Sequence, residues 1–116
     1  MKRYTALLLF QFNVVVPSKV VCRRTCEKRM ITFCAKAPTD ALRYAKKYGA
    51  ESEYSYKNHE HHTVYFQFIG VLDILELAIE CDKVTMWYDI VEMNNPMERK
   101  HSIIPSDEEL YCSMNR

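Results

Sequence analysis

Residues 38–49 read Pro-Thr-Asp-Ala-Leu-Arg-Tyr-Ala-Lys-Lys-Tyr-Gly, and this stretch decides the fold class. Thr39 stands where a helix N-cap is expected, and Asp40 suits the positive end of a helix dipole. Gly49 is typical of the left-handed residue that ends a helix. The apolar residues between them recur at helical spacing: Ala41, Leu42, Ala45 and Tyr48. The stretch therefore predicts an amphipathic helix of about ten residues that packs one face on the rest of the protein.

On both sides of this helix the apolar residues follow the two-residue period of β-strands. Gly70 lies inside one of these segments and indicates a bulge or a bend. The predicted fold class is α+β: a mostly antiparallel sheet of about five strands, in the order strand, strand, helix, strand, strand, strand, with the helix on one face. The strands are expected at residues 4–16, 20–36, 51–57, 63–77 and 84–91.

The C-terminal part of the chain has a different character. Asn94-Asn95-Pro96 ends the predicted sheet, so residues 1–93 are interpreted as a single α+β domain and residues 94–116 as a C-terminal extension. Ser106 and Glu109 have the spacing of a capping box. A short terminal helix is therefore expected after Ser106.

Composition places the chain among ordinary globular proteins. It has 116 residues, of which 48% are hydrophobic and 27% charged, so general disorder is excluded. The five cysteines form no Cys-x-x-Cys pair, which favours a reducing, cytoplasmic location. The apolar N-terminal run 6–10 is too short for a membrane span, and no membrane partner is expected.

Charge is unevenly divided along the chain. Residues 1–72 carry 12 Lys/Arg against 5 Asp/Glu, and residues 73–116 carry 4 against 10, which together give the net charge of +1. Two interpretations stay open. The halves form separate basic and acidic surfaces, or antiparallel pairing joins them as cross-strand ion pairs.

The sequence His59-Glu60-His61-His62 resembles a metal site at first reading. A metalloprotease helix needs His-Glu-x-x-His, but Thr63 occupies the fifth position. In an extended segment His59 and His61 share a face while His62 points away, and no third ligand stands at a fixed spacing nearby. No metal and no cofactor are expected, and His59 and His61 are interpreted as partner-contacting residues at a hairpin tip.

No catalytic constellation is recognised in the sequence. Two glycines in the whole chain exclude a glycine-rich phosphate loop. Pairs of acids such as Asp73 with Glu76 are far more often solvated or ion-paired than catalytic. We therefore expect a protein that is not an enzyme and has no catalytic residues.

A nucleic-acid-binding module is the alternative hypothesis. Basic residues cluster in the second predicted strand, and Tyr44, Tyr54 and Tyr56 are candidate surfaces for stacking on bases. The near-neutral net charge argues against this function. The basic residues concerned are Arg23, Arg24, Lys28 and Arg29.

Several blocks of sequence resemble a bacterial family, the domain of unknown function numbered 4288 in its series. They include Phe68-Ile69-Gly70-Val71-Leu72-Asp73, the Ser-Tyr-Lys-Asn of residues 55–58, and Met86-Trp87-Tyr88. The likeness covers about residues 4–90. It implies the fold and its loops but no established activity, and similar proteins carry a glycine-containing acidic turn where this chain has residues 59–62.

Small α+β proteins of this sort are similar to immunity proteins, which neutralise a cognate bacterial toxin by surface complementarity. The expected function is therefore a protein-binding module whose partner is a protein toxin, a nuclease in particular. An uncovered edge strand would also support a homodimer. Trp87 and Tyr88 are among the expected contacts, and the alternative is that these two aromatic side chains pack the sheet. The expected contacts are Asp73, Glu76, Asp82, Asp89, Trp87 and Tyr88, together with the two histidines named above.

Overall fold

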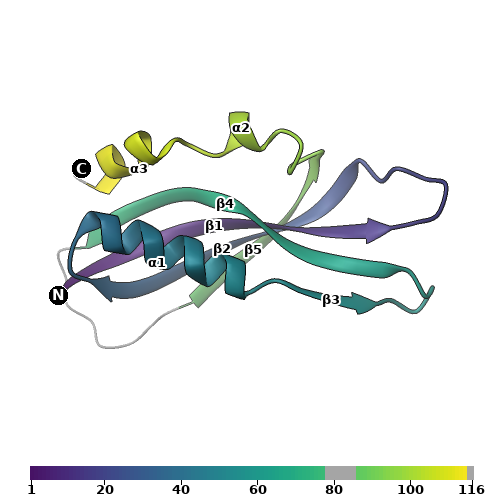
Figure 1. Cartoon of the computed structure of the whole chain (residues 1–116), viewed down its shortest axis with the longest axis horizontal. Coiled ribbons are helices and arrows are strands. Elements are labelled where there is room, and N and C mark those ends of the chain that lie inside the picture. The colour runs from purple at the N-terminus through teal and green to yellow at the C-terminus, as the bar shows by residue number, and fades with distance from the viewer. Residues whose placement is uncertain (78–85, 115–116) are drawn as a thin grey trace.

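The computed structural model describes residues 1–77 and 86–114, and it confirms the α+β class and the order of the elements (Figure 1). Asp82 and the turn expected around it lie outside the described residues. The short helix α2 was not predicted, whereas the terminal helix α3 was. The elements are β1 (Lys2–Val15), β2 (Arg23–Ala35), α1 (Pro38–Glu51), β3 (Tyr54–Lys57), β4 (Thr63–Leu77), β5 (Met86–Asn94), α2 (Lys100–Ile103) and α3 (Asp107–Met114).

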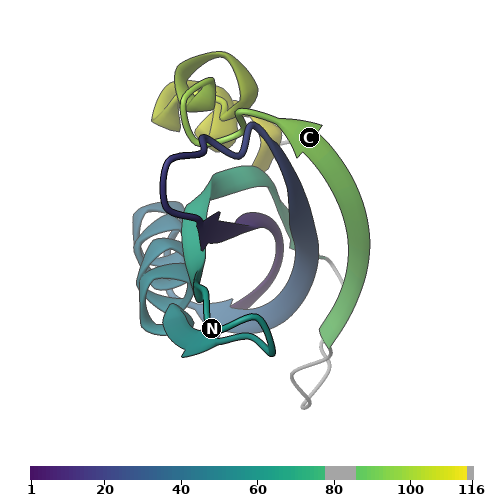
Figure 2. The same cartoon turned by 90° about the vertical axis from the view of Figure 1, so that its right-hand side faces the viewer.

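The five strands form one antiparallel sheet in the order β3-β4-β1-β2-β5. β1 takes the centre because its side chains are apolar on both faces. Leu8 and Phe10 on one face and Leu9 on the other are all completely buried. The sheet is strongly curved, with α1 on one side and β5 as the outer strand on the other (Figure 2).

The main core lies between α1 and the sheet. Phe10 of β1 stacks on Phe66 of β4 with ring centroids 4.7 Å apart. Helix α3 adds Leu110 and Met114 to the same core. The β1, β2 and α1 residues that complete it include Ala6, Leu8, Ile31, Phe33, Ala41, Leu42 and Ala45.

A second, smaller core covers part of the opposite face of the sheet. It is built on Leu9, Cys26 and Ile69, against which side chains of β5 and of the segment after it pack. Residues 94–114 thus contribute to both cores. The division of the chain at residue 93 stays a prediction.

Both predicted ends of α1 are wrong. The helix begins at Pro38 with Ala37 as its extended N-cap, and no side chain caps it, so Thr39 is not the cap. Gly49 is buried within the helix and has no positive φ, and the helix continues to Glu51. Gly49 is required for close packing, because a Cβ there would lie 2.5 Å from a ring carbon of Phe68.

The irregularity expected at Gly70 is confirmed. The register of β1 with β4 shifts between Leu7 and Leu8 and again between Leu9 and Phe10, on either side of the residues paired with Val71 and Gly70. A Cβ on Gly70 would lie 2.8 Å from Cγ1 of Ile104. The bulged part of β4 is therefore the place where the C-terminal segment approaches the sheet backbone.

Gly70→Ala is expected to lower the free energy of unfolding by about 1–3 kcal/mol, because the new methyl group displaces the stiff, β-branched Ile104. Gly49→Ala is the matched control. Its clash is with the half-buried Phe68 ring, which can turn aside, and alanine gains about 1 kcal/mol of helix propensity. Urea denaturation shows which variant loses more free energy of unfolding. A larger loss for Gly49→Ala than for Gly70→Ala would contradict this account.

Candidate functional site

Edge strand β5 exposes large apolar side chains on both of its faces. Trp87 is 54% exposed, Tyr88 63% and Ile90 49%. Helix α1 packs on β4, β1 and β2, and β5 follows β2 as the outermost strand of the sheet. We call residues 87–90 the β5 edge. Both aromatic side chains are more exposed than buried, which argues against the alternative that they serve only to pack the sheet.

Trp87 continues a row of side chains that crosses the sheet. In the strand register Trp87 pairs with Met30, Met30 with Leu7, and Leu7 with Asp73. These four residues, which we call the outer row, share the face turned away from α1 and span about 14 Å at the usual strand spacing. Met30 is itself 37% exposed. The row thus joins an aromatic anchor, an apolar centre and a carboxylate.

The structure brings together only part of the expected contact set. Asp73 and Trp87 belong to the outer row. Asp89, two residues after Trp87 in β5, lies on the same face. Tyr88 projects from the other face of β5, opposite Arg29. Glu76 pairs with Lys2 at 3.5 Å and lies outside the row.

The histidine loop lies at the other edge of the sheet. His59 and His61 are exposed in the turn between β3 and β4, and β3 and β5 are opposite edge strands. The Asn58 side chain accepts hydrogen bonds from the backbone N–H groups of Glu60 and His62, each at 3.0 Å. Within residues 1–77 and 86–114, no three His, Cys, Asp or Glu side chains gather as metal ligands.

His61 has a left-handed backbone with φ of 64°. His61→Gly is expected to raise the free energy of unfolding by about 0.5–1 kcal/mol, because glycine adopts this conformation without strain. His61→Val should lower it by a similar amount. Thermal denaturation tests both variants, and equal stability of the two would contradict this account of the turn.

The four basic residues of the nucleic-acid hypothesis do not form one surface. They alternate between the faces of β2, and Arg23 is engaged by Glu92. Arg24 is buried, with its guanidinium bound to both carboxylate oxygens of Glu98 and to the side-chain oxygen of Gln11. This geometry does not favour a continuous phosphate-binding patch.

Lys28 is half-buried, and Arg29 lies against the main core. Its guanidinium lies 4.8 Å from the Phe10 ring centroid, and its Nε donates to the Glu27 carboxylate. The Tyr48 hydroxyl accepts a further hydrogen bond at 3.4 Å. Cation–π contact and ion pairing together hold Arg29 beneath the end of α1.

The hydrogen bonds from Arg24 hold the pKa of Glu98 below its ordinary value of 4.5. Because the folded-state pKa is the lower one, this pair stabilises the protein above the ordinary pKa, and the contribution is lost as pH falls through the lowered pKa. Glu98→Gln is therefore expected to reduce the loss of stability on acidification. Urea midpoints measured between about pH 6 and pH 3 test this, and an unchanged pH dependence would contradict it.

Ion pairs join the two oppositely charged halves of the sequence. Lys46 of α1 pairs with Asp107 of α3 at 2.9 Å, and Lys2 of β1 pairs with Glu76 of β4. The pairs Arg23–Glu92 and Arg24–Glu98 also connect the halves. Of the two interpretations of the charge asymmetry, the structure supports cross-strand and interelement pairing.

The described cysteines, Cys22, Cys26, Cys34 and Cys112, carry free thiols. Burial raises the pKa of the Cys26 thiol, which makes it a poor nucleophile near neutral pH. No helix within the described ranges is both long and apolar enough to cross a membrane.

Two contributors to the exposed surface were missed in the sequence. The alternating pattern places Met30 and Ile90 in strands and predicts no binding role for either of them. Their exposure depends on β5 being the outermost strand next to β2, which is a matter of strand order. Periodicity within one strand carries no signal for that order.

The sequence profile of a family described as "Domain of unknown function (DUF4288)" matches residues 4–86. The chain belongs to the DUF4288 family. The match covers β1, β2, α1, β3 and β4 and stops where β5 begins. No curated protein and no solved structure matches this DUF4288 protein. Its β5 edge therefore follows the matched region rather than lying within it.

Proposed function

We propose that this DUF4288 protein is a non-enzymatic protein-binding module whose partner docks on the β5 edge and the outer row. The observation that carries the proposal is the exposure of Trp87, Tyr88 and Ile90 on both faces of an edge strand. A large apolar cluster on an edge strand invites association, which natural proteins usually prevent with charges or cover. Tryptophan and tyrosine are also the residues most enriched in binding hot spots.

The outer row supplies the centre of the interface. Trp87 and Met30 offer adjacent apolar side chains, while Asp73 and Asp89 place carboxylates on the same face. Such an arrangement, with apolar anchors and a charged rim, is typical of specific protein interfaces. The side of β5 away from β2 also lacks a strand partner among the described residues, so a partner strand could add there.

The partner that we propose is a cognate bacterial toxin, and the setting is the cytoplasm. The free thiols are consistent with a reducing compartment. Because ion pairs already engage several of the acidic residues, the proposal rests on the aromatic edge more than on overall negative charge. An immunity protein needs a rigid scaffold and an exposed surface for its toxin, and the exposed β5 edge supports this proposal.

Co-expression with the product of the adjacent gene tests this function. We expect growth to be rescued, and the two proteins to co-purify as a stoichiometric complex. Rescue and complex should both be lost with Trp87→Ala combined with Tyr88→Ala. A toxic product that this chain neither binds nor neutralises, or a complex indifferent to the double substitution, would refute the proposal. Sedimentation of the chain alone separates partner binding from self-association through β5.

A further inference from the structure

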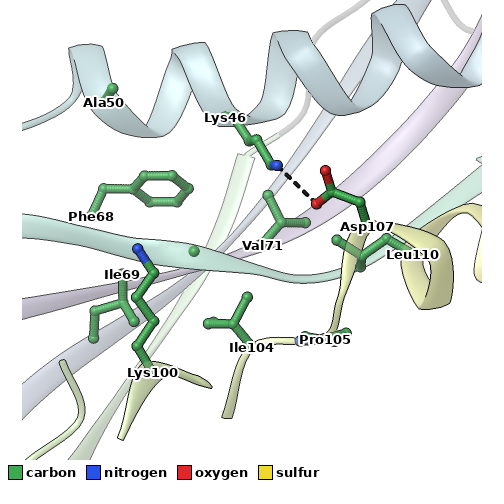
Figure 3. A pocket seen from close by; sticks show the side chains of 11 residues that line it. Lys46, Ala50, Phe68, Ile69, Val71, Lys100, Ile104, Pro105, Asp107 and Leu110 are labelled. Atoms are coloured by element: carbon green, nitrogen blue, oxygen red, sulfur yellow. Dashed lines mark hydrogen bonds and ion pairs between the residues drawn. The ribbon is translucent and has the colours of Figure 1, made fainter. Parts of the chain in front are cut away.

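A cavity of about 380 Å³ lies between α1, the bulged part of β4 and the segment that carries α2 and α3 (Figure 3). Its volume falls in the range of about 300–1,000 Å³ that is usual for small-molecule sites. It is separate from the β5 edge, since β4 and β5 are not neighbours in the sheet. Its walls therefore come from three parts of the chain that are distant in sequence.

The floor of the cavity is apolar and its ends differ in charge. Phe68 and Val71 of β4 face Ile104 and Leu110 of the C-terminal segment across it. Lys46 is neutralised at one end by its ion pair with Asp107.

At the other end, Figure 3 shows the Lys100 ammonium group beside Phe68 and Ile69. Lys100 forms no ion pair with any residue in the described ranges. The cavity thus offers one unneutralised positive charge next to an apolar channel.

Both glycines of the chain maintain this cavity. Gly49 allows the Phe68 ring to lie against α1, and Gly70 allows Ile104 to lie against β4. A side chain at either position would push a lining residue out of place. The close packing around the cavity is therefore built in at two independent positions.

We propose that this cavity binds a small amphiphilic carboxylate of the medium-chain fatty acid type. The carboxylate is held by Lys100, and the alkyl chain lies along Phe68, Val71 and Ile104 toward Leu110. The Lys46–Asp107 pair leaves no free charge at the far end, so the ligand carries its charge at one end only. Each buried methylene should tighten binding about fourfold, which makes chain length the main determinant of affinity.

Titration of the ¹⁵N-labelled chain with octanoate, followed by amide chemical shifts, tests this site. We expect saturable shifts at Gly70 and Val71, about tenfold weaker binding for Lys100→Gln, and unchanged binding for Lys47→Gln. Lys47 is the matched control, because it is a well-exposed lysine of α1 that does not line the cavity. Octanol should bind more weakly than octanoate, because it lacks the negative charge that Lys100 holds.

Ala50→Phe provides a second variant, because Ala50 lines the cavity but belongs to neither core, so its new ring can fill the cavity without replacing a core side chain. Octanoate should no longer produce saturable shifts in Ala50→Phe, while Trp87→Ala should bind it normally. Shifts that never saturate, or equal affinity in wild type, Lys100→Gln and Ala50→Phe, would overturn the proposal. Neither result bears on partner binding at the β5 edge.

Discussion

Phe10→Ala is expected to lower the free energy of unfolding by about 3–5 kcal/mol, a large share of the stability of a domain of this size. Phe10 is completely buried at the centre of β1. Its ring stacks on Phe66 at 4.7 Å and meets Phe68 at 5.5 Å. The loss therefore combines the transfer of an aromatic ring to water with a cavity that neighbouring strands cannot close.

The same substitution also affects the ion pair of Arg29 and Glu27. The Arg29 guanidinium lies over the Phe10 ring, and both charged side chains are largely buried. Removing the ring admits water to this pair and removes the cation–π contact.

Phe12→Ala is the matched control. Phe12 lies two residues after Phe10 on the same face of β1, but it is only half-buried, and its ring is tilted against that of Phe66. Its cost should be less than half that of Phe10→Ala. Guanidinium denaturation with an unchanged m-value measures both, and equal costs would show that the core is not centred on Phe10.

Trp87→Ala is expected to weaken binding of the partner by about 2 kcal/mol or more, which is roughly thirtyfold in Kd. Trp87 is the anchor of the outer row and the largest side chain on the β5 edge. Because it is more than half exposed in the free protein, its removal should change the free energy of unfolding by no more than about 0.5 kcal/mol. Isothermal titration with the purified partner and parallel denaturation separate the two effects.

Tyr56→Ala is the control for this prediction. Tyr56 is an exposed aromatic residue on the opposite edge strand, β3, where it stacks on Tyr54 with centroids 6.1 Å apart. We expect its removal to leave partner affinity unchanged. If Tyr56→Ala weakened binding as much as Trp87→Ala, the interface would have to be placed at the other edge.

Much of the fold follows from local periodicity in the sequence. The strand predicted at residues 63–77 matches β4 from its first residue to its last, and the capping box at Ser106 and Glu109 forms as expected, with a hydrogen bond of 3.2 Å from the Glu109 N–H to the Ser106 hydroxyl. Alternation also assigned the side chains of β1 and β2 to their faces, because a side chain in a strand has only two directions to choose from.

The ends of α1 were not predictable because tertiary contacts decide them. Gly49 has the usual residue type for a helix end, yet the helix continues past it to Glu51, and the side chain that Gly49 lacks would overlap the Phe68 ring of β4. Thr39 has the usual residue type for a cap, yet Pro38 already begins the helix. At both ends the residue type alone predicts the wrong boundary. Pro38 starts the helix before Thr39, and Gly49 serves the packing of Phe68 instead of ending the helix.

The candidate site depended on strand order, which periodicity does not encode. Trp87 and Asp73 were expected to be contacts, but only the sheet order shows that Leu7 and Met30 connect them. The same order separates His59 and His61 from Trp87 by the width of the sheet. The charge asymmetry left two interpretations open for a related reason, since only the packing of the elements shows that residues of the basic half pair with residues of the acidic half.

Trp87 is the single tryptophan of the chain, so one measurement reports directly on the β5 edge. The chain is labelled with 5-fluorotryptophan, and its ¹⁹F resonance is recorded alone and with the unlabelled product of the adjacent gene. We predict a solvent-exposed signal in the free protein that shifts, and loses its dependence on the H₂O/D₂O ratio, when the complex forms. A complex that forms while this resonance keeps its position and its solvent dependence would contradict the central claim that the partner binds at the β5 edge.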